Sequence, residues 1–173
     1  MKNIIFLGGI HRVGKSTLAR AFCKDSALIH KSAGYLIGSV GADKQVADVS
    51  GNQARLIEAV NNLDRTAKYL LDGHFCLWGK DGQIKPIETE VFEKLFLAAV
   101  ILLQGDVQVI QNRIRELGER NCTVAFLEDF QQKELEQAKK ISKTLDIPMR
   151  VITLSKIDDD ILLVKDFVES VFL

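Results

Sequence analysis

The 173-residue sequence has few cysteines, and their positions exclude two kinds of structure. Cys23, Cys76 and Cys122 are far apart and odd in number, and the sequence contains no CxxC pair and no Cys/His spacing typical of a metal site. Disulfide-rich scaffolds and zinc sites depend on such paired spacings. We therefore expect three reduced thiols and no zinc.

Long apolar runs are also missing from the sequence. None reaches the roughly 18 residues that a membrane-spanning helix needs. The short apolar segment after Met1 is interrupted by glycines and followed by charge, which differs from a secretory signal. We expect no membrane association and a cytoplasmic location.

The sequence has no surplus of positive charge, because 23 lysines and arginines balance 23 aspartates and glutamates. A broad nucleic-acid-binding face usually needs such a surplus. The balance disfavours nucleic acid as a partner without excluding a local basic cluster. With only two prolines and no repeat or linker, residues 1–173 are expected to form a single domain, as a monomer or a homodimer.

What the sequence does contain is an alternation of short apolar runs with longer amphipathic segments. The apolar runs are continuous, as in parallel strands covered on both faces, and span residues 3–8, 27–30, 69–72, 98–103 and 150–154. Helical spacing occurs in residues 15–22, 52–63, 106–117, 127–145 and 160–172. The Asp-Gly pair within residues 79–86 indicates a turn or short hairpin. This order predicts an α/β fold with helices on both faces of a parallel sheet.

Residues 9–16 match the phosphate-loop pattern G-x-x-x-x-G-K-S/T. The context supports the match, because an apolar strand enters the segment and a helix leaves it, so that backbone N–H groups and a helix N-terminus converge on an anion. Lys15 is expected to reach the β- and γ-phosphates and the Ser16 hydroxyl to join a Mg²⁺ shell. The segment predicts MgATP binding by Gly9, Ile10, His11, Arg12, Val13, Gly14, Lys15, Ser16 and Thr17.

Two side chains inside the loop have more than one interpretation. Arg12 either adds positive charge beside the phosphates or points to solvent, and the leniency of interior loop positions favours solvent. His11 either contacts a phosphate or ribose, or hydrogen-bonds to its own backbone.

Asp72 ends an apolar run and is followed by a glycine, the place where P-loop enzymes usually hold an aspartate for Mg²⁺. We expect Asp72 to anchor the metal or the acceptor, and the alternative is that it caps the next turn. His74 either lines the acceptor pocket or packs as an ordinary histidine.

The order of these segments resembles the adenylate kinase-like nucleoside and nucleotide kinases, especially the compact archaeal-type adenylate kinases. The resemblance covers most of the chain and rests on the loop, "KSAGYLI" (residues 31–37), "LLDGHF" (residues 70–75) and "IQNRIRELGERN" followed by a long polar helix. It implies a P-loop NTPase three-layer α/β/α sandwich with five parallel strands in the order 2-3-1-4-5. It also implies a short lid at about residues 117–125.

The resemblance places the acceptor beside the end of the second strand, with Ser32 and Gly34 in matching positions. Two family features are missing, since Tyr35 occupies the usual acidic position and Gly38 the position of an arginine that grips an acceptor phosphate. AMP is therefore not established as the acceptor. The predicted acceptor-binding residues are Ser32, Gly34, Gln53 and His74, with Arg55 more consistent with a solvated helix face.

Arginines near residue 115 provide the predicted lid chemistry. Arg113 and Arg115 diverge on a helix and cannot both face one ligand. Family resemblance assigns the lid arginines to Arg113 and Arg120, which would neutralise charge on the transferring phosphoryl group. The alternative is a charged helix end in which Glu116 and Glu119 pair with these arginines.

The combined prediction is a kinase that transfers the γ-phosphoryl group of MgATP to a small nucleotide or nucleoside-like acceptor. Its predicted catalytic residues are Lys15, Asp72, Arg113 and Arg120, and its predicted metal ligands are Ser16 and Asp72. A regulatory ATPase or switch without an acceptor is the alternative, and a kinase for nucleic-acid ends is a weaker one. The chain is short for an oligomeric motor domain of the AAA type.

Overall fold

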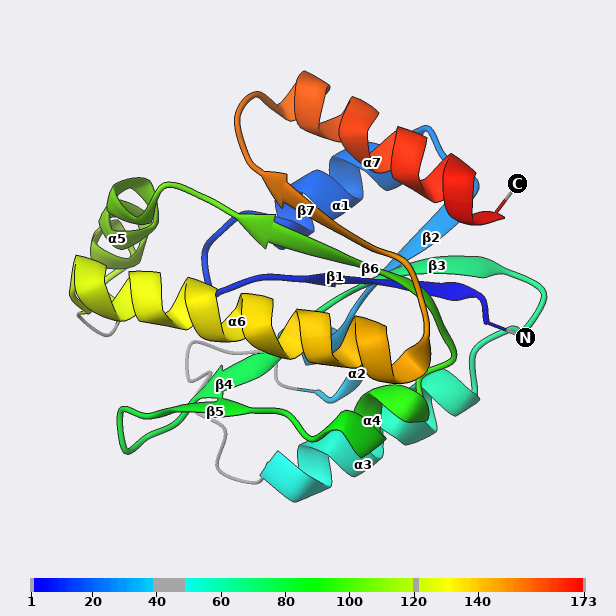
Figure 1. Ribbon diagram of the computed structural model, residues 1–173, viewed down its shortest axis with the longest axis horizontal. Helices are drawn as coiled ribbons and strands as arrows, with labels where there is room; N and C mark the ends of the chain where they lie inside the picture. The colour runs from blue at the N-terminus through cyan, green and yellow to red at the C-terminus, as the bar shows by residue number, and fades with distance from the viewer. Residues whose placement is uncertain (1, 39–48, 120–121, 173) are drawn as a thin grey trace.

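The computed structural model of the protein describes residues 2–38, 49–119 and 122–172, and its centre is a five-stranded parallel sheet (Figure 1). The strands of this sheet are β1 (Ile4–Gly8), β2 (Leu28–Ser32), β3 (Lys68–Asp72), β6 (Leu97–Gln104) and β7 (Met149–Thr153). Their order across the sheet is β2-β3-β1-β6-β7. Counted along the chain, this is the predicted order 2-3-1-4-5, and all neighbouring pairs are parallel.

Helices cover both faces of the sheet, as the continuous apolar runs predict (Figure 1). One face packs against α1 (Lys15–Lys24) and α7 (Ile157–Phe172), and α5 (Val107–Glu116) also contributes to that core. The other face packs against α3 (Val49–Asn61), α4 (Thr89–Glu93) and much of α6 (Val124–Leu145). The α/β/α sandwich is therefore confirmed.

Strand β1 shows why these apolar runs do not alternate with polar residues. Ile5 and Leu7 belong to the core beneath α1 and α7, whereas Ile4 and Phe6 belong to the core beneath α3 and α4. Successive side chains of a strand point to opposite faces, so a strand covered on both faces needs apolar residues throughout.

The boundaries of several elements differ from the predicted ones. Strand β2 ends at Ser32 rather than His30, which brings Ser32 level with Asp72 on the neighbouring strand β3. Helix α6 begins at Val124 because the Thr123 hydroxyl caps it by accepting from the Phe126 N–H at 3.1 Å. The predicted hairpin is confirmed as β4 (Cys76–Trp78) paired antiparallel with β5 (Ile84–Pro86), and the short helix α2 (Ala33–Leu36) was not predicted.

Two glycines allow the carboxyl ends of β1 and β3 to pack closely. A Cβ atom at Gly8 would lie 2.1 Å from the Phe75 ring, and a Cβ atom at Gly73 would lie 2.7 Å from the Phe6 ring. The Phe6 ring contacts the Phe75 and Phe92 rings edge-on, with centroids 4.9 and 5.4 Å away. Each strand end therefore accommodates an aromatic ring from the other segment, which fixes their relative position.

Candidate active site

The loop between β1 and α1 has the unusual backbone that phosphate binding requires. Gly9 and Gly14 have φ angles of 150° and 120°, and Arg12 has a φ of 62° although it carries a side chain. At Gly9 a Cβ atom would also lie 2.8 Å from the Leu103 carbonyl oxygen. The loop leads directly into the N-terminus of α1, where backbone N–H groups and the helix dipole favour an anion.

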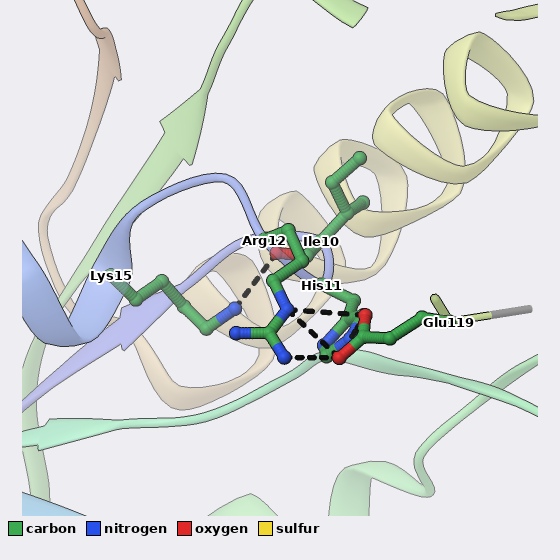
Figure 2. A network of polar contacts seen from close by, with 5 residues as sticks. All are labelled: Ile10, His11, Arg12, Lys15 and Glu119. Atoms are coloured by element: carbon green, nitrogen blue, oxygen red, sulfur yellow. Dashed lines mark hydrogen bonds and ion pairs between the residues drawn. The ribbon is translucent and has the colours of Figure 1, made fainter. Parts of the chain in front are cut away.

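Lys15 is buried inside the curve of this loop. Its Nζ donates a hydrogen bond to the carbonyl oxygen of Gly9 at 2.7 Å and another to that of Ile10 at 2.9 Å. The second of these is drawn in Figure 2. The ammonium group is thus held beside the backbone that would surround the phosphates, and Lys15 also lines the adjoining cavity. This position suits the predicted contact with the β- and γ-phosphates.

Asp72 lies at the carboxyl end of β3 and joins the loop to β2. Its Oδ2 accepts a hydrogen bond from the Ser16 hydroxyl at 2.9 Å and lies 2.6 Å from Nε2 of His30. Burial raises the pKa of Asp72, but hydrogen bonds from His30, Ser16 and Ser32 outweigh this effect and leave its pKa below the ordinary value. Asp72 is therefore an ionised carboxylate at neutral pH.

The Ser16 hydroxyl and the Asp72 carboxylate fit a magnesium ion, which prefers oxygen ligands and usually combines one or two carboxylates with phosphate oxygens and water. Among the described residues there is no cluster of three or more histidine, cysteine or acidic side chains that would form an all-protein metal cage. The metal role of Ser16 and Asp72 stays a prediction.

The sequence interpretation missed His30. Its position in the second strand, two residues before Ser32, was the available signal, because β2 and β3 are paired neighbours and end at the same edge of the sheet. The ring is largely buried and contacts the same Asp72 oxygen, Oδ2, as the Ser16 hydroxyl.

Arg113 reaches the loop from α5. Its Nη1 donates to the carbonyl oxygens of Arg12 and Val13 at 3.1 and 3.3 Å. The guanidinium group thus lies where it can approach phosphates held by the loop. The other predicted lid arginine, Arg120, lies outside the described residues, and so does part of the predicted lid at residues 117–125.

Glu119 makes the largest unpredicted contact at the loop. Arg12 Nε lies 3.1 Å from both carboxylate oxygens of Glu119, with a further contact from Arg12 Nη2, and His11 Nε2 lies 2.7 Å from Glu119 Oε2 (Figure 2). The favoured solvent orientation of Arg12 is therefore wrong. Among the described residues, the partners of Glu119 belong to the phosphate loop rather than to its own segment. The alternative in which Glu119 pairs with Arg120 lies outside the described residues.

We expect replacement of Glu119 by glutamine to tighten ADP binding by up to about fivefold, as for the loss of a partly exposed ion pair at the surface. The carboxylate engages two cationic or polar loop side chains and adds negative charge where phosphates would bind. The measurement is the ADP dissociation constant by titration calorimetry. Glu116→Gln, on the exposed end of α5, is the matched control, and unchanged or weaker binding in Glu119→Gln would contradict the prediction.

This contact also has a defined pH dependence. Hydrogen bonding from Arg12, opposed by desolvation and aided by His11, lowers the pKa of Glu119 from 4.5 to about 2. Because the folded-state pKa is depressed, the stabilisation by the contact is complete above pH 4.5 and is lost as the pH falls through about 2. The contact therefore persists at neutral pH.

A cavity of about 1010 Å³ connects the loop with the predicted acceptor region. All four predicted acceptor residues line it: Ser32, Gly34, Gln53 and His74. Their acceptor role stays a prediction. Arg55 instead donates to Asn52 at 2.9 Å on the same helix, and Gly38 is an exposed turn residue with a φ of 76°.

The far wall of this cavity is apolar, and the sequence interpretation did not anticipate it. Side chains from α3, the β4–β5 hairpin and the α4 region share the wall: Leu56, Leu77, Ile87, Val91, Phe92 and Leu95. The cavity thus combines a cationic loop, the carboxylates of Asp72 and Asp160, and an apolar surface.

The fold and the loop together define a P-loop NTPase of the α/β/α class. The chain belongs to the AAA domain family, whose model matches residues 8–131. This family assignment does not test whether the chain is too short for a motor of the AAA type, which stays a prediction. No curated protein matches the chain in sequence.

Several solved structures share the fold along nearly the whole chain. A shikimate kinase from Bacteroides thetaiotaomicron is 15% identical with a TM-score of 0.62, and the match covers 96% of this chain and 98% of that one. A sugar kinase from Janibacter is 13% identical with a TM-score of 0.60, covering 98% and 95%. A gluconokinase from Sinorhizobium meliloti is 12% identical with a TM-score of 0.59, covering 99% and 96%. At these identities the similarity establishes the fold alone.

In the part of the chain that the structure describes, no helix is both long and apolar enough to cross a bilayer.

Proposed function

We propose that the protein is an ATP-dependent small-molecule kinase that transfers the γ-phosphoryl group of MgATP to a nucleotide or nucleoside-like acceptor. The observation that supports this most is the position of Asp72, whose Oδ2 lies 2.9 Å from the loop hydroxyl of Ser16 while the residue also lines the cavity. One carboxylate is thus shared between the donor loop and the acceptor space. The cytoplasmic location and a monomeric or homodimeric state remain part of this proposal. An adenylate kinase-like specificity, in which a phosphate group is the acceptor, is its alternative form.

Phosphoryl transfer depends on positioning and on neutralising charge, which the described residues can do. Lys15 binds the β- and γ-phosphates, and Arg113 approaches the transferring group from α5. Ser16 and Asp72 would hold the Mg²⁺ ion, which would supply further neutralisation of the phosphate charge.

The acceptor group is a hydroxyl in this proposal. Asp72 is ionised and acts as the general base, so the hydroxyl proton passes to its carboxylate as the acceptor oxygen bonds to the γ-phosphorus and the bond to the ADP oxygen breaks. An anionic phosphate acceptor, as in the alternative form, would need no general base. The apolar wall suits the ring of a nucleoside-like molecule, and the three structural neighbours named above are kinases for small molecules.

Acceptor-dependent formation of ADP tests the proposal. The protein is incubated with MgATP and a panel of nucleosides, nucleoside monophosphates, sugars and sugar acids, and ADP is measured with a coupled assay. We expect ADP to form at a high rate only when a hydroxyl acceptor with an apolar ring is present. ADP release at one rate with every compound, or none with any, would contradict a small-molecule kinase.

The alternative of a regulatory ATPase has one specific observation in its favour. The contact of Glu119 with His11 and Arg12 connects the segment after α5 to the loop, so that phosphate binding would compete with it. Acceptor-independent ADP release would favour this alternative.

A further inference from the structure

Helix α6 places three polar side chains against the loops at the carboxyl edge of the sheet. Gln131 bonds to the backbone N–H and carbonyl of Gly105 at 2.8 and 3.0 Å, and Gln137 donates to the Ile87 carbonyl at 2.6 Å. Between them, Glu134 Oε1 accepts from the N–H groups of Phe75 and Cys76 at 3.0 and 2.9 Å. Of these three side chains that hydrogen-bond to the backbone, only Glu134 can ionise.

Glu134 is fully buried, at 0% exposure, on the apolar face of α6. Its Oε2 is buried without a hydrogen-bond partner in the described part of the chain. Burial raises the pKa of Glu134, and the opposing influences are the N–H of Cys76, the charge of Lys15 and the N–H groups of Phe75 and Gly9. The carboxyl group therefore lies where its charge depends on its neighbours.

The ionisable groups that face Glu134 come from three elements. Lys15 approaches from the loop and α1, and His74 Nδ1 lies 3.9 Å from Glu134 Oε1 in the segment after β3. On α6 itself, the nearest ionisable residues in sequence are Lys133 and Glu136, and Lys133 pairs with Asp129. Lys15 is the positive charge that favours the ionised form of Glu134.

Nucleotide phosphates would change this balance. They bring several negative charges to Lys15, which offset its positive charge and add negative potential in a region of low dielectric. Both effects disfavour the ionised form of Glu134 and so raise its pKa. A protonated carboxyl group can still accept the hydrogen bonds from the Phe75 and Cys76 N–H groups. These two hydrogen bonds would therefore be retained when Glu134 takes up a proton.

We propose that Glu134 is a positioning residue that joins the phosphate loop to the 74–76 segment, and that it takes up a proton when nucleotide phosphates engage Lys15. This inference goes beyond the proposed kinase activity, because it requires nucleotide binding but no acceptor. It makes the charge beside the segment that leads from Asp72 to the cavity wall depend on the state of the loop.

Titration calorimetry with ADP and Mg²⁺ tests the inference. The binding enthalpy is measured near neutral pH in buffers of low and high ionisation enthalpy, and its slope against the ionisation enthalpy gives the protons taken up per nucleotide. The proteins are the wild type, Glu134→Gln and Glu136→Gln. Glutamine at position 134 keeps an oxygen for the two N–H groups and removes the titration, whereas Glu136 undergoes the same change at an exposed site of the same helix.

We expect Glu134→Gln to take up fewer protons than the wild type, with Glu136→Gln unchanged. Protons exchanged by the nucleotide or by histidines distant from Glu134 appear in all three proteins and cancel in the comparison. His74 lies 3.9 Å from Glu134 Oε1, so the difference between wild type and Glu134→Gln is the proton uptake of this pair. Equal slopes in wild type and Glu134→Gln would overturn the inference about Glu134. The assignment of the loop as a nucleotide-binding site would be unaffected. If the wild type shows no binding heat in any of the buffers, both the inference about Glu134 and the proposed nucleotide-dependent function would be overturned.

Discussion

Replacing Lys15 by alanine is expected to lower kcat/KM for ADP formation from MgATP by at least about 10²–10³-fold, the usual cost of losing a preorganised group that stabilises developing charge. The Lys15 ammonium lies inside the loop, 2.7 and 2.9 Å from the Gly9 and Ile10 carbonyl oxygens. The substitution therefore removes both the positive charge facing the phosphates and two hydrogen bonds that hold the loop. The measurement is steady-state turnover with the best acceptor of the panel.

The control for this experiment is Lys24→Ala, in which an exposed lysine of the same helix α1 is removed. We expect that variant to retain wild-type turnover. A Lys15→Ala protein that is folded and loses less than about tenfold would contradict the assignment of Lys15 to the phosphates.

Replacing Asp72 by asparagine is expected to lower turnover by about 10²–10⁴-fold, the range for loss of a general base. Asparagine keeps the size of the side chain and an oxygen for the Ser16 hydroxyl, but it removes the charge that, in the proposed mechanism, would hold the metal and accept the proton. Binding of ADP without Mg²⁺ should change far less than turnover. The two quantities are measured by coupled assay and calorimetry, with Asp166→Asn on the exposed face of α7 as the control.

The pH dependence of the wild type gives a second test of Asp72. Its pKa lies below the ordinary 3.8, so the ionised form and its contribution to stability are present above pH 3.8 and are lost as the pH falls through the lower folded-state value. Asp72 should therefore cause no acidic loss of kcat/KM above pH 3.8. A Asp72→Asn protein with near-normal turnover would exclude the carboxylate from the reaction.

The parts of the site that could be predicted from sequence are those that depend on local order along the chain. The loop from Gly9 to Thr17 is fixed by a strand, two glycines and a helix that are contiguous, and Asp72 is marked by the end of an apolar run. Strand order was predicted from a resemblance that follows the same succession of elements, and it is confirmed.

The parts that could not be predicted depend on contacts between distant segments. Glu119 pairs with Arg12 across 107 positions, and Glu134 with Phe75 across 59. His30 meets Asp72 only because β2 and β3 are neighbours in the sheet. Each of these side chains has an ordinary sequence context, so no periodicity or motif distinguishes it from a solvated charge or a packed histidine.

Gly8 packs against the Phe75 ring and Gly73 packs against the Phe6 ring, so the ends of the two strands hold each other in place. This packing fixes how closely the carboxyl ends of β1 and β3, which lead to the phosphate loop and carry Asp72, can approach one another. Leu56 and Leu77 line the cavity and take no part in this glycine–ring packing. The shape of the acceptor space therefore depends in part on residues other than those that hold the two strand ends together.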